Sequence, residues 1–557
     1  MYSSAYLRRT YREGGKVRNE TVANLSALPE HVIDGIDAGL KGRRLVPADE
    51  AFSIVRSLPH GHVAAVTAMA HRLGVPAMLG PAGRSRDLAL ALIISRVIRR
   101  GSKLSTLSWW GDTTLGPDLG VVGASTDEVY AAMDWMVGRQ DAIEKQLAAK
   151  HLAAKVNPSR MALFDLTSAW VTGHCCGLAA RGYSRDHRTG CEQIEYGLLC
   201  DPAGRPVAVR VFAGNTADPT AFTAVRDTFG LAQMVMVGDR GMITGARIAA
   251  LRELGGIGWL TALRAPAIAK LAADGGPLQM SLFDQQDLAE ITHPDYPGER
   301  LIACRNPALA TERARKRADL LAATEKLLAP ILARVAAGRL AGADRIGIAV
   351  GKIIDKYKMG KHFQLTITDT SLRVARDQAR IDAEAALDGL YVLRTSVPAD
   401  QLDPAGVVTG YKNLAHVERD FRSIKADDLD LRPIHHRLDD RVKAHVLICM
   451  LACYLVWHLR RAWTPMTFTD EAPPQRDNPV APAKRSTAAD AKASTKQDPA
   501  GAGLRSFRGL LDHLATLTRN QVRYHDTSTE VPMLTEATPD QRRAFDLIGT
   551  PIPLHAA

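Results

Sequence analysis

Residues 195–212, EYGLLCDPAGRPVAVRVF, are the stretch that decides the fold. Two apolar runs flank the turn sequence Asp201-Pro202-Ala203-Gly204, which predicts a β-hairpin. Further short apolar runs surround it, namely MALFDL (161–166), MVMVG (234–238) and IGWLTAL (257–263), with helical patterns at 218–229 and 243–254. The predicted order is strand, hairpin strands, helix, strand, helix, strand, so we expect an α/β fold.

The composition is that of an ordinary globular protein. Hydrophobic residues make up 46% and charged residues 24% of the 557 residues, which excludes collagen-like, wholly disordered and disulfide-scaffold classes. The formal net charge is +11 and the pI is about 9.3. This excess favours a polyanionic partner, either nucleic acid or an acidic membrane surface.

Several features predict a cytoplasmic protein. The chain has seven cysteines, an odd number without a CxxC pair, which fits a reducing compartment. The first 20 residues lack the apolar core of a signal peptide. The longest nearly apolar run, Ala444 to Trp457, is shorter than the roughly 20 residues of a membrane helix, so we expect no membrane partner.

Changes of pattern divide the chain into parts. A basic β-hairpin (1–46) opens it, and a helical domain with the basic stretch RVIRRGSK (96–103) follows at 47–155 as a candidate DNA-binding domain. The core occupies 156–265 and 391–465 around a mixed, β-rich insertion domain at 266–390. Residues 466–503 have the composition of a disordered linker, and 504–557 of a helical C-terminal tail.

Two aspartates are associated with strands of the core. Asp165 lies inside MALFDL, where burial of an uncompensated carboxylate is costly unless a metal or another partner holds it. Asp239 follows MVMVG directly, at the carboxyl end of a strand, where open α/β sheets bind ligands. The alternatives are a turn formed by Asp165 with Thr167 or Ser168, and a helix N-cap at Asp239.

A third acid, Glu418, lies in a helical pattern at 411–425. If this stretch is one helix, Tyr411, Leu414, Glu418, Arg422 and Lys425 share a face. A charged surface helix is the alternative. Three carboxylates without Cys or His at transition-metal spacing suit Mg²⁺ or Mn²⁺, and paired ions suit phosphoryl transfer. Together with the basic charge, these acids predict cleavage or joining of nucleic acid.

The ordered set of Asp165, Asp239 and Glu418 resembles bacterial insertion-sequence transposases of the DDE type, specifically the insertion-sequence-four superfamily. The hallmark of this group is a Y-x2-R-x3-E-x6-K helix, and this sequence has Tyr411, Leu414 in place of the Arg, Glu418 and Lys425. The stretches GNTADP (214–219) and TYREGGK (10–16) also resemble the family. The resemblance implies a ribonuclease-H-like catalytic core with an insertion between the second and third acids.

The resemblance also implies the reaction. We expect cut-and-paste transposition, in which a dimer binds terminal inverted repeats of double-stranded DNA, hydrolyses a phosphodiester and joins the 3′-OH to target DNA. Asp165, Asp239 and Glu418 would bind Mg²⁺ or Mn²⁺, two ions in all. Tyr411 and Lys425 would hold end phosphates, and we expect Arg422 to substitute for the Arg that Leu414 replaces.

Two other functions stay open. The same core would serve a two-metal nuclease that cuts without joining, or a catalytically silent, transposase-derived DNA-binding protein. Two motifs also stay open: His435-His436 either contacts DNA or caps a turn, and His445, Cys449 and Cys453 share an apolar helix on which core packing is favoured over a metal site.

Overall fold

The chain forms two compact units in a computed structural model. The structure describes residues 4–43, 47, 51–152, 161–182, 184–186, 188, 190–216, 234–238, 243, 248–249, 252–253, 257–273, 276–474, 478–524 and 529–556. One unit comprises residues 1–59 with 517–537, and the other comprises 60–516 with 538–557. Asp239, the predicted helix at 218–229 and most of the predicted helix at 243–254 lie outside the described residues.

The smaller unit contains the predicted basic hairpin. Strand β1 (Tyr6–Glu13) pairs antiparallel with β2 (Lys16–Asn24) around Gly14 and Gly15, whose positive φ angles suit a tight turn. Helix α1 (Glu30–Leu40) follows. A second sheet has the order β15-β14-β3, formed by β3 (Phe52–Pro59), β14 (Thr518–Tyr524) and β15 (Glu530–Leu534). The structure therefore differs from the prediction in two respects: a strand opens the region 47–155, and the C-terminal tail is partly β.

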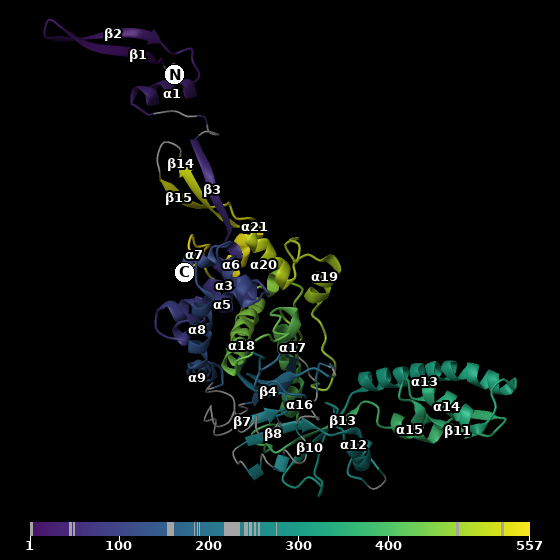
Figure 1. Cartoon of the computed structure of the whole chain (residues 1–557). Coiled ribbons are helices and arrows are strands. Elements are labelled where there is room, and N and C mark those ends of the chain that lie inside the picture. The colour runs from purple at the N-terminus through teal and green to yellow at the C-terminus, as the bar shows by residue number, and fades with distance from the viewer. Residues whose placement is uncertain are drawn as a thin grey trace. The chain divides into compact units, whose positions relative to one another are not determined.

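The larger unit is built around a sheet with the order β6-β5-β4-β7-β8-β13-β10-β9 (Figure 1). Its strands are β4 (Met161–Trp170), β5 (Gln193–Cys200), β6 (Pro206–Ala213), β7 (Met234–Val237), β8 (Ile257–Ala262), β9 (Leu288–Ile291), β10 (Arg300–Arg305) and β13 (Leu390–Thr395). Strand β7 runs parallel to β4 and β8 parallel to β7, whereas β5 is antiparallel to β4 and β6 to β5. The five predicted core strands are present, which confirms the mixed α/β class.

The hairpin of β5 and β6 has the predicted turn. The Asp201 carboxylate accepts hydrogen bonds from the backbone N–H groups of Ala203 (3.0 Å) and Arg205 (2.7 Å). Gly204 has φ +80°, and a Cβ there would lie 2.5 Å from the Cβ of His416. Glycine is therefore required both by the turn and by the close approach of the helix that carries His416.

Helix α18 (Asp439–Ala462) is the central helix of this unit, and it contacts β6 as well as α3, α5 and α8. The helices before the sheet are α3 (Gly61–Arg72), α4 (Val75–Leu79), α5 (Arg84–Ile98), α6 (Lys103–Trp110), α7 (Leu115–Asp118), α8 (Thr126–Val137) and α9 (Gln140–His151). By length and composition α18 could cross a membrane, but 83% of its most apolar window is buried in the protein. Burial among these elements explains its apolar sequence.

The predicted insertion at 266–390 has two parts. The first part contributes β9 and β10 to the central sheet, and it also contains α12 (Ala265–Leu271) and η1 (Met280–Leu282). This part therefore belongs to the core and does not form the separate insertion domain that was predicted. The second has its own apolar core. It consists of α13 (Pro307–Ala336), α14 (Ala343–Ile354), η2 (Gly360–His362), β11 (Phe363–Ile367), β12 (Leu372–Arg376) and α15 (Gln378–Ala385).

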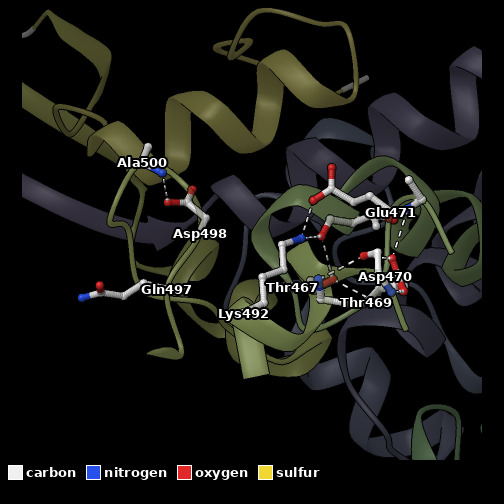
Figure 2. Close-up of polar contacts among 12 residues, drawn as sticks. Thr467, Thr469, Asp470, Glu471, Lys492, Gln497, Asp498 and Ala500 are labelled. Carbon is white, nitrogen blue, oxygen red and sulfur yellow. Dashed lines mark hydrogen bonds and ion pairs between the residues drawn. The ribbon is translucent and has the colours of Figure 1, made fainter. Parts of the chain in front are cut away.

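Residues 466–503 differ from the predicted disordered linker. This stretch contains α19 (Thr487–Thr495), and η4 (Thr464–Met466) precedes it. Figure 2 shows Lys492 bonded to Glu471, and the carboxylate of Asp498 accepting from the backbone of Ala500. Composition predicted disorder because few side chains here are apolar, whereas specific polar contacts order the segment. Helices α20 (Phe507–Ala515) and α21 (Pro539–Leu547) complete the unit.

We expect the stretch 466–503 to resist proteolysis because of the buried Asp498 carboxylate. It accepts from the N–H groups of Ala500 and Ala502 and from Arg543, so Asp498→Ala leaves all three donors unpaired. The loss of these hydrogen bonds costs about 1–3 kcal/mol. Trypsin should therefore cut the Asp498→Ala variant after Lys492 roughly tenfold faster than the unsubstituted protein. Limited proteolysis with mass spectrometry measures this. Asp490→Ala, at an exposed position of α19, is the control, and equal rates in the two variants would contradict the prediction.

A second prediction concerns the buried carboxyl of Asp420, which accepts from the thiols of Cys200 (3.5 Å) and Cys453 (3.9 Å). Burial raises its pKa from 3.8 to about 7. Between these values the folded protein keeps a proton that the unfolded chain loses, so stability falls as the pH rises from 4 to 7. Asp420→Asn should remove this decline and raise the free energy of unfolding at pH 8 by about 2–4 kcal/mol.

Thermal unfolding midpoints between pH 4 and 8 test the effect of Asp420. The exposed Asp400 provides the matched control, since Asp400→Asn makes the same chemical change outside the core. A pH profile of Asp420→Asn that parallels the unsubstituted protein would show that the buried carboxyl does not titrate in this range.

Candidate active site

One face of the sheet positions the candidate site. Side chains alternate between the faces of a strand, and Phe164 and Leu166 of β4 belong to the apolar core on one face. Asp165 and Thr167 consequently project from the other face. Tyr196 of β5 pairs with Thr167 in register, and its ring contacts that of Phe421 edge-on at 5.6 Å. Phe421 lies on α17 (Leu414–Arg422), so α17 covers the face that carries Asp165.

Asp165 is half-buried on this face. One of its carboxylate oxygens accepts from the backbone N–H of Leu166 at 2.8 Å. The last described register pair between β4 and β7 joins Leu163 to Val237. Asp165 and Asp239 each follow that pair by two positions, but Asp239 lies outside the described residues.

The segment predicted as one helix over 411–425 is divided into three parts. They are α16 (Pro404–Lys412), α17, and η3 (Ser423–Asp427), which is one turn of π-helix. Glu418 and Arg422, four residues apart, are both exposed on α17, whereas Leu414 is buried and Tyr411 on α16 is half-buried. The structure thus brings Glu418 and Arg422 onto one exposed face, without Leu414.

Lys425 faces the interior. Its ammonium donates to Thr167 of β4 and to Asp186 at 2.8 Å, and its side chain is 10% exposed. A π turn inserts one extra residue, which rotates Lys425 away from the exposed face of Glu418. Burial lowers the pKa of Lys425, and the Asp186 carboxylate opposes that shift. The expectation that Lys425 shares a face with Glu418 was wrong for this reason.

The residues around Lys425 were not predicted from the sequence. Asp186 also pairs with Arg432, and the guanidinium groups of Arg432 and Arg188 lie 4.8 and 4.1 Å from the ring centroid of Trp170. The stretch 181–190 is rich in Arg and has a single acid, Asp186. That composition was the available signal, but it does not show which cations meet Asp186. This cluster attaches η3 and the following loop to the end of β4.

The arrangement offers oxygen ligands rather than a complete metal site. Asp165 and Glu418 come from a strand and from the helix that packs on it, and their carboxylates are of the kind that Mg²⁺ and Mn²⁺ bind. Among the described residues no group of three Asp, Glu, His or Cys side chains could hold a metal ion. Asp239 lies outside the described residues. The donors present therefore fit a divalent cation in type.

Two family models match parts of this chain. A family model described as "Transposase DDE domain" matches residues 160–456, and one described as "IS1634 family transposase, N-terminal domain" matches residues 1–47. No curated protein matches the chain.

Among solved structures, the chain is similar to a piggyBac transposase synaptic complex with hairpin DNA. The sequence identity is 9% and the TM-score 0.31, over 82% of this chain and 76% of that one. A likeness at this level adds nothing to the assignment. The DDE model spans more than half of the 557 residues, including both strand β4 and helix α17. The chain therefore belongs to the DDE transposase family of insertion sequences.

Proposed function

We propose that this protein binds the terminal inverted repeats of an insertion sequence and catalyses metal-dependent cleavage and strand transfer of DNA. The observation that carries the proposal is the packing of α17, the helix of Glu418, on the face of β4 that bears Asp165. Two acids far apart in the sequence are thereby carried by adjacent elements. The family assignment makes nucleic-acid chemistry the natural use of this pair.

We assign the core to the ribonuclease-H-like class and the chain to the insertion-sequence-four superfamily. The order β6-β5-β4-β7-β8, in which only β5 runs against the other four strands, supports the first assignment. Tyr411, Glu418 and Lys425 at signature spacing support the second. The region 47–155 and the basic hairpin are proposed to bind DNA, and two copies would pair the two transposon ends in the cytoplasm, on nucleoid DNA.

Asp165, Asp239 and Glu418 are the proposed ligands of two Mg²⁺ or Mn²⁺ ions. The equal offsets of Asp165 and Asp239 from the pair of Leu163 with Val237 support a shared site. When bound, the ions supply positive charge that polarises the phosphodiester and stabilises the leaving oxygen. The chain itself orients the ligands, because the contact of Tyr196 on β5 with Phe421 of α17, and the bond of Lys425 on η3 to Thr167 of β4, hold the α17–η3 segment against the sheet.

Arg422, Tyr411 and Lys425 are the proposed DNA contacts of the signature segment. Arg422 is exposed one turn beyond Glu418, which supports its role as the substitute for the Arg that Leu414 replaces. To bind a phosphate, Lys425 would first have to break its ion pair with the Asp186 carboxylate. In the absence of DNA, Lys425 orients η3 against β4.

The central prediction is that Asp165→Asn and Glu418→Gln abolish chemistry but retain DNA binding. Each change removes a charged ligand while keeping the shape, and the lost stabilisation of several kcal/mol should lower cleavage at least about a hundredfold. The substrate is duplex DNA carrying the inverted repeats that flank the gene, with Mg²⁺ and a target plasmid. Cleavage and joining are scored separately on gels, and binding is measured by fluorescence anisotropy.

Glu312→Gln on α13, exposed in the insertion, is the matched control and should cut as the unsubstituted protein does. Cutting without joined products would support a nuclease instead. Binding with no metal-dependent cutting by the unsubstituted protein would identify a silent DNA-binding protein and refute the catalytic proposal.

A separate prediction concerns Arg422. Arg422→Ala should weaken binding of end DNA and reduce the slope of log K against log salt by about 0.9, the value for one phosphate contact. Thermal stability should not change, because Arg422 is exposed. Arg419→Ala changes the net charge equally at the next exposed cation of α17, about 100° around the helix from Glu418. Equal slopes in the two variants would show that Arg422 does not hold a phosphate.

A further inference from the structure

Three features of the sequence meet in one cavity. They are the basic stretch 96–103, the pair His435-His436, and His445 of α18. The cavity has a volume of about 350 Å³ and lies between the α5–α6 connection, α8 and the loop that follows η3. All of its lining residues belong to the larger unit.

Two buried cations at this cavity have no carboxylate partner among the described residues. The Lys103 ammonium lies 3.3 Å from Nδ1 of His445, and the Lys103 residue is 6% exposed. Arg96, equally buried, donates to the backbone carbonyl of Leu429 at 3.2 Å. Asp430 is the single acid among the lining residues, and it is exposed. A buried ammonium without an acid either gains an anion from elsewhere or loses its proton, whereas the guanidinium of Arg96 keeps its charge.

The backbone adds to the positive potential. Helix α6 begins at the cavity, with Gly101, Ser102, Lys103 and Leu104 among the lining residues. Ser102 caps this helix by accepting from the N–H of Ser105 at 3.1 Å. The N-terminus of a helix carries partial positive charge and favours anions. The helix end and the two buried cations are independent features that favour the same kind of ligand.

The surroundings of Lys103 weaken its protonation. Burial, together with the neighbouring Arg96, lowers its pKa from 10.5 to about 7. His436, with a pKa lowered to about 4 by burial, and His445, with a pKa well below 6.5, are neutral at pH 7. Cys449 also faces Lys103 and, being buried, has a raised pKa. An anion in the cavity would restore the charge of Lys103.

We infer that this cavity binds a phosphate group of the DNA backbone, through Lys103, Arg96 and the N-terminus of α6. The source of the phosphate rests on the proposed function. The exposed Arg100 and His435 at the cavity favour an extended polyanion over a small enclosed ligand. Arg100 also donates to the backbone carbonyls of Ala426 and Asp427 in η3. Phosphate bound in this cavity would therefore affect, through Arg100, the segment that follows Glu418.

The first test uses inorganic phosphate and the full chain at constant ionic strength. Phosphate at ten times its dissociation constant should raise the unfolding midpoint by roughly 1–2 °C, and Lys103→Met should abolish the rise. Met keeps the apolar stem of the buried lysine, so folding should be retained. Lys145→Met, at an exposed position of α9, is the charge-matched control.

A second pair of variants leaves the buried residues unchanged. Leu104, 58% exposed at the cavity, is changed to Glu, which should repel phosphate, or to Gln, which should not. The DNA arm measures the affinity of these variants and of Lys103→Met for duplex DNA across a salt series. Lys103→Met should weaken binding about three- to tenfold and lower the salt slope by about 0.9, whereas Lys145→Met should not.

The outcomes separate the site from the proposed function. Loss of both the phosphate and the DNA effect in Lys103→Met and Leu104→Glu supports the inference. Loss of the phosphate effect with unchanged DNA binding overturns DNA as the source and identifies a site for free phosphate. No effect of phosphate on any variant, with unchanged DNA binding, overturns the site. If the unsubstituted protein binds no DNA, the proposed function fails, and the phosphate arm alone decides the site.

Discussion

The position of the α17–η3 segment on the β4–β5 face is the constraint on which the candidate site depends. Three contacts of different kinds fix it: the ring of Phe421 on Tyr196, the approach of His416 to Gly204, and the bonds of Lys425 to Thr167 and Asp186. The ring contact buries apolar area, and the lack of a side chain at Gly204 lets the helix approach the hairpin. The bonds of Lys425 are directional and fix the orientation of the segment. Together they hold an exposed glutamate over a strand that carries an aspartate.

The buried lysine is the costly part of this arrangement. An ammonium removed from water is tolerated only with a close, hydrogen-bonded partner, and Asp186 serves both Lys425 and Arg432. Such a pair contributes little net stability, but it discriminates strongly against alternative registers, because a shift of one residue would leave charges buried and unpaired. The π turn at 423–427 is what directs Lys425 inward while Glu418 and Arg422 remain exposed. The π turn and the ion pair thus fix where Glu418 lies rather than adding much stability.

Short apolar runs bounded by turn residues predicted strands β4 to β8, because each run must pair with neighbours and the signal is local. Four other features could not be predicted from local sequence patterns. A helical period of residues cannot indicate a π turn, so Lys425 was placed on the wrong face. The pairing of β3 with β14 joins opposite ends of the chain. The stretch 466–503 is ordered by single polar contacts such as Asp498 with Arg543, which composition does not report. Asp186 was missed because its partners, Lys425 and Arg432, are distant in sequence.

The basic excess of the chain acquires a spatial meaning through these contacts. Two cations of the stretch 96–103, Arg96 and Arg100, donate to backbone carbonyls of the segment that follows Glu418. A carbonyl neutralises no charge, so these arginines hold the loop while their positive potential stays available to an anion. Hydrogen bonds thus connect the helical region before the sheet to the segment that follows Glu418, and both lie in the same positive potential. Under the proposed function, the cations that attract phosphate would also orient Glu418, because Arg100 is bonded to the segment that follows it.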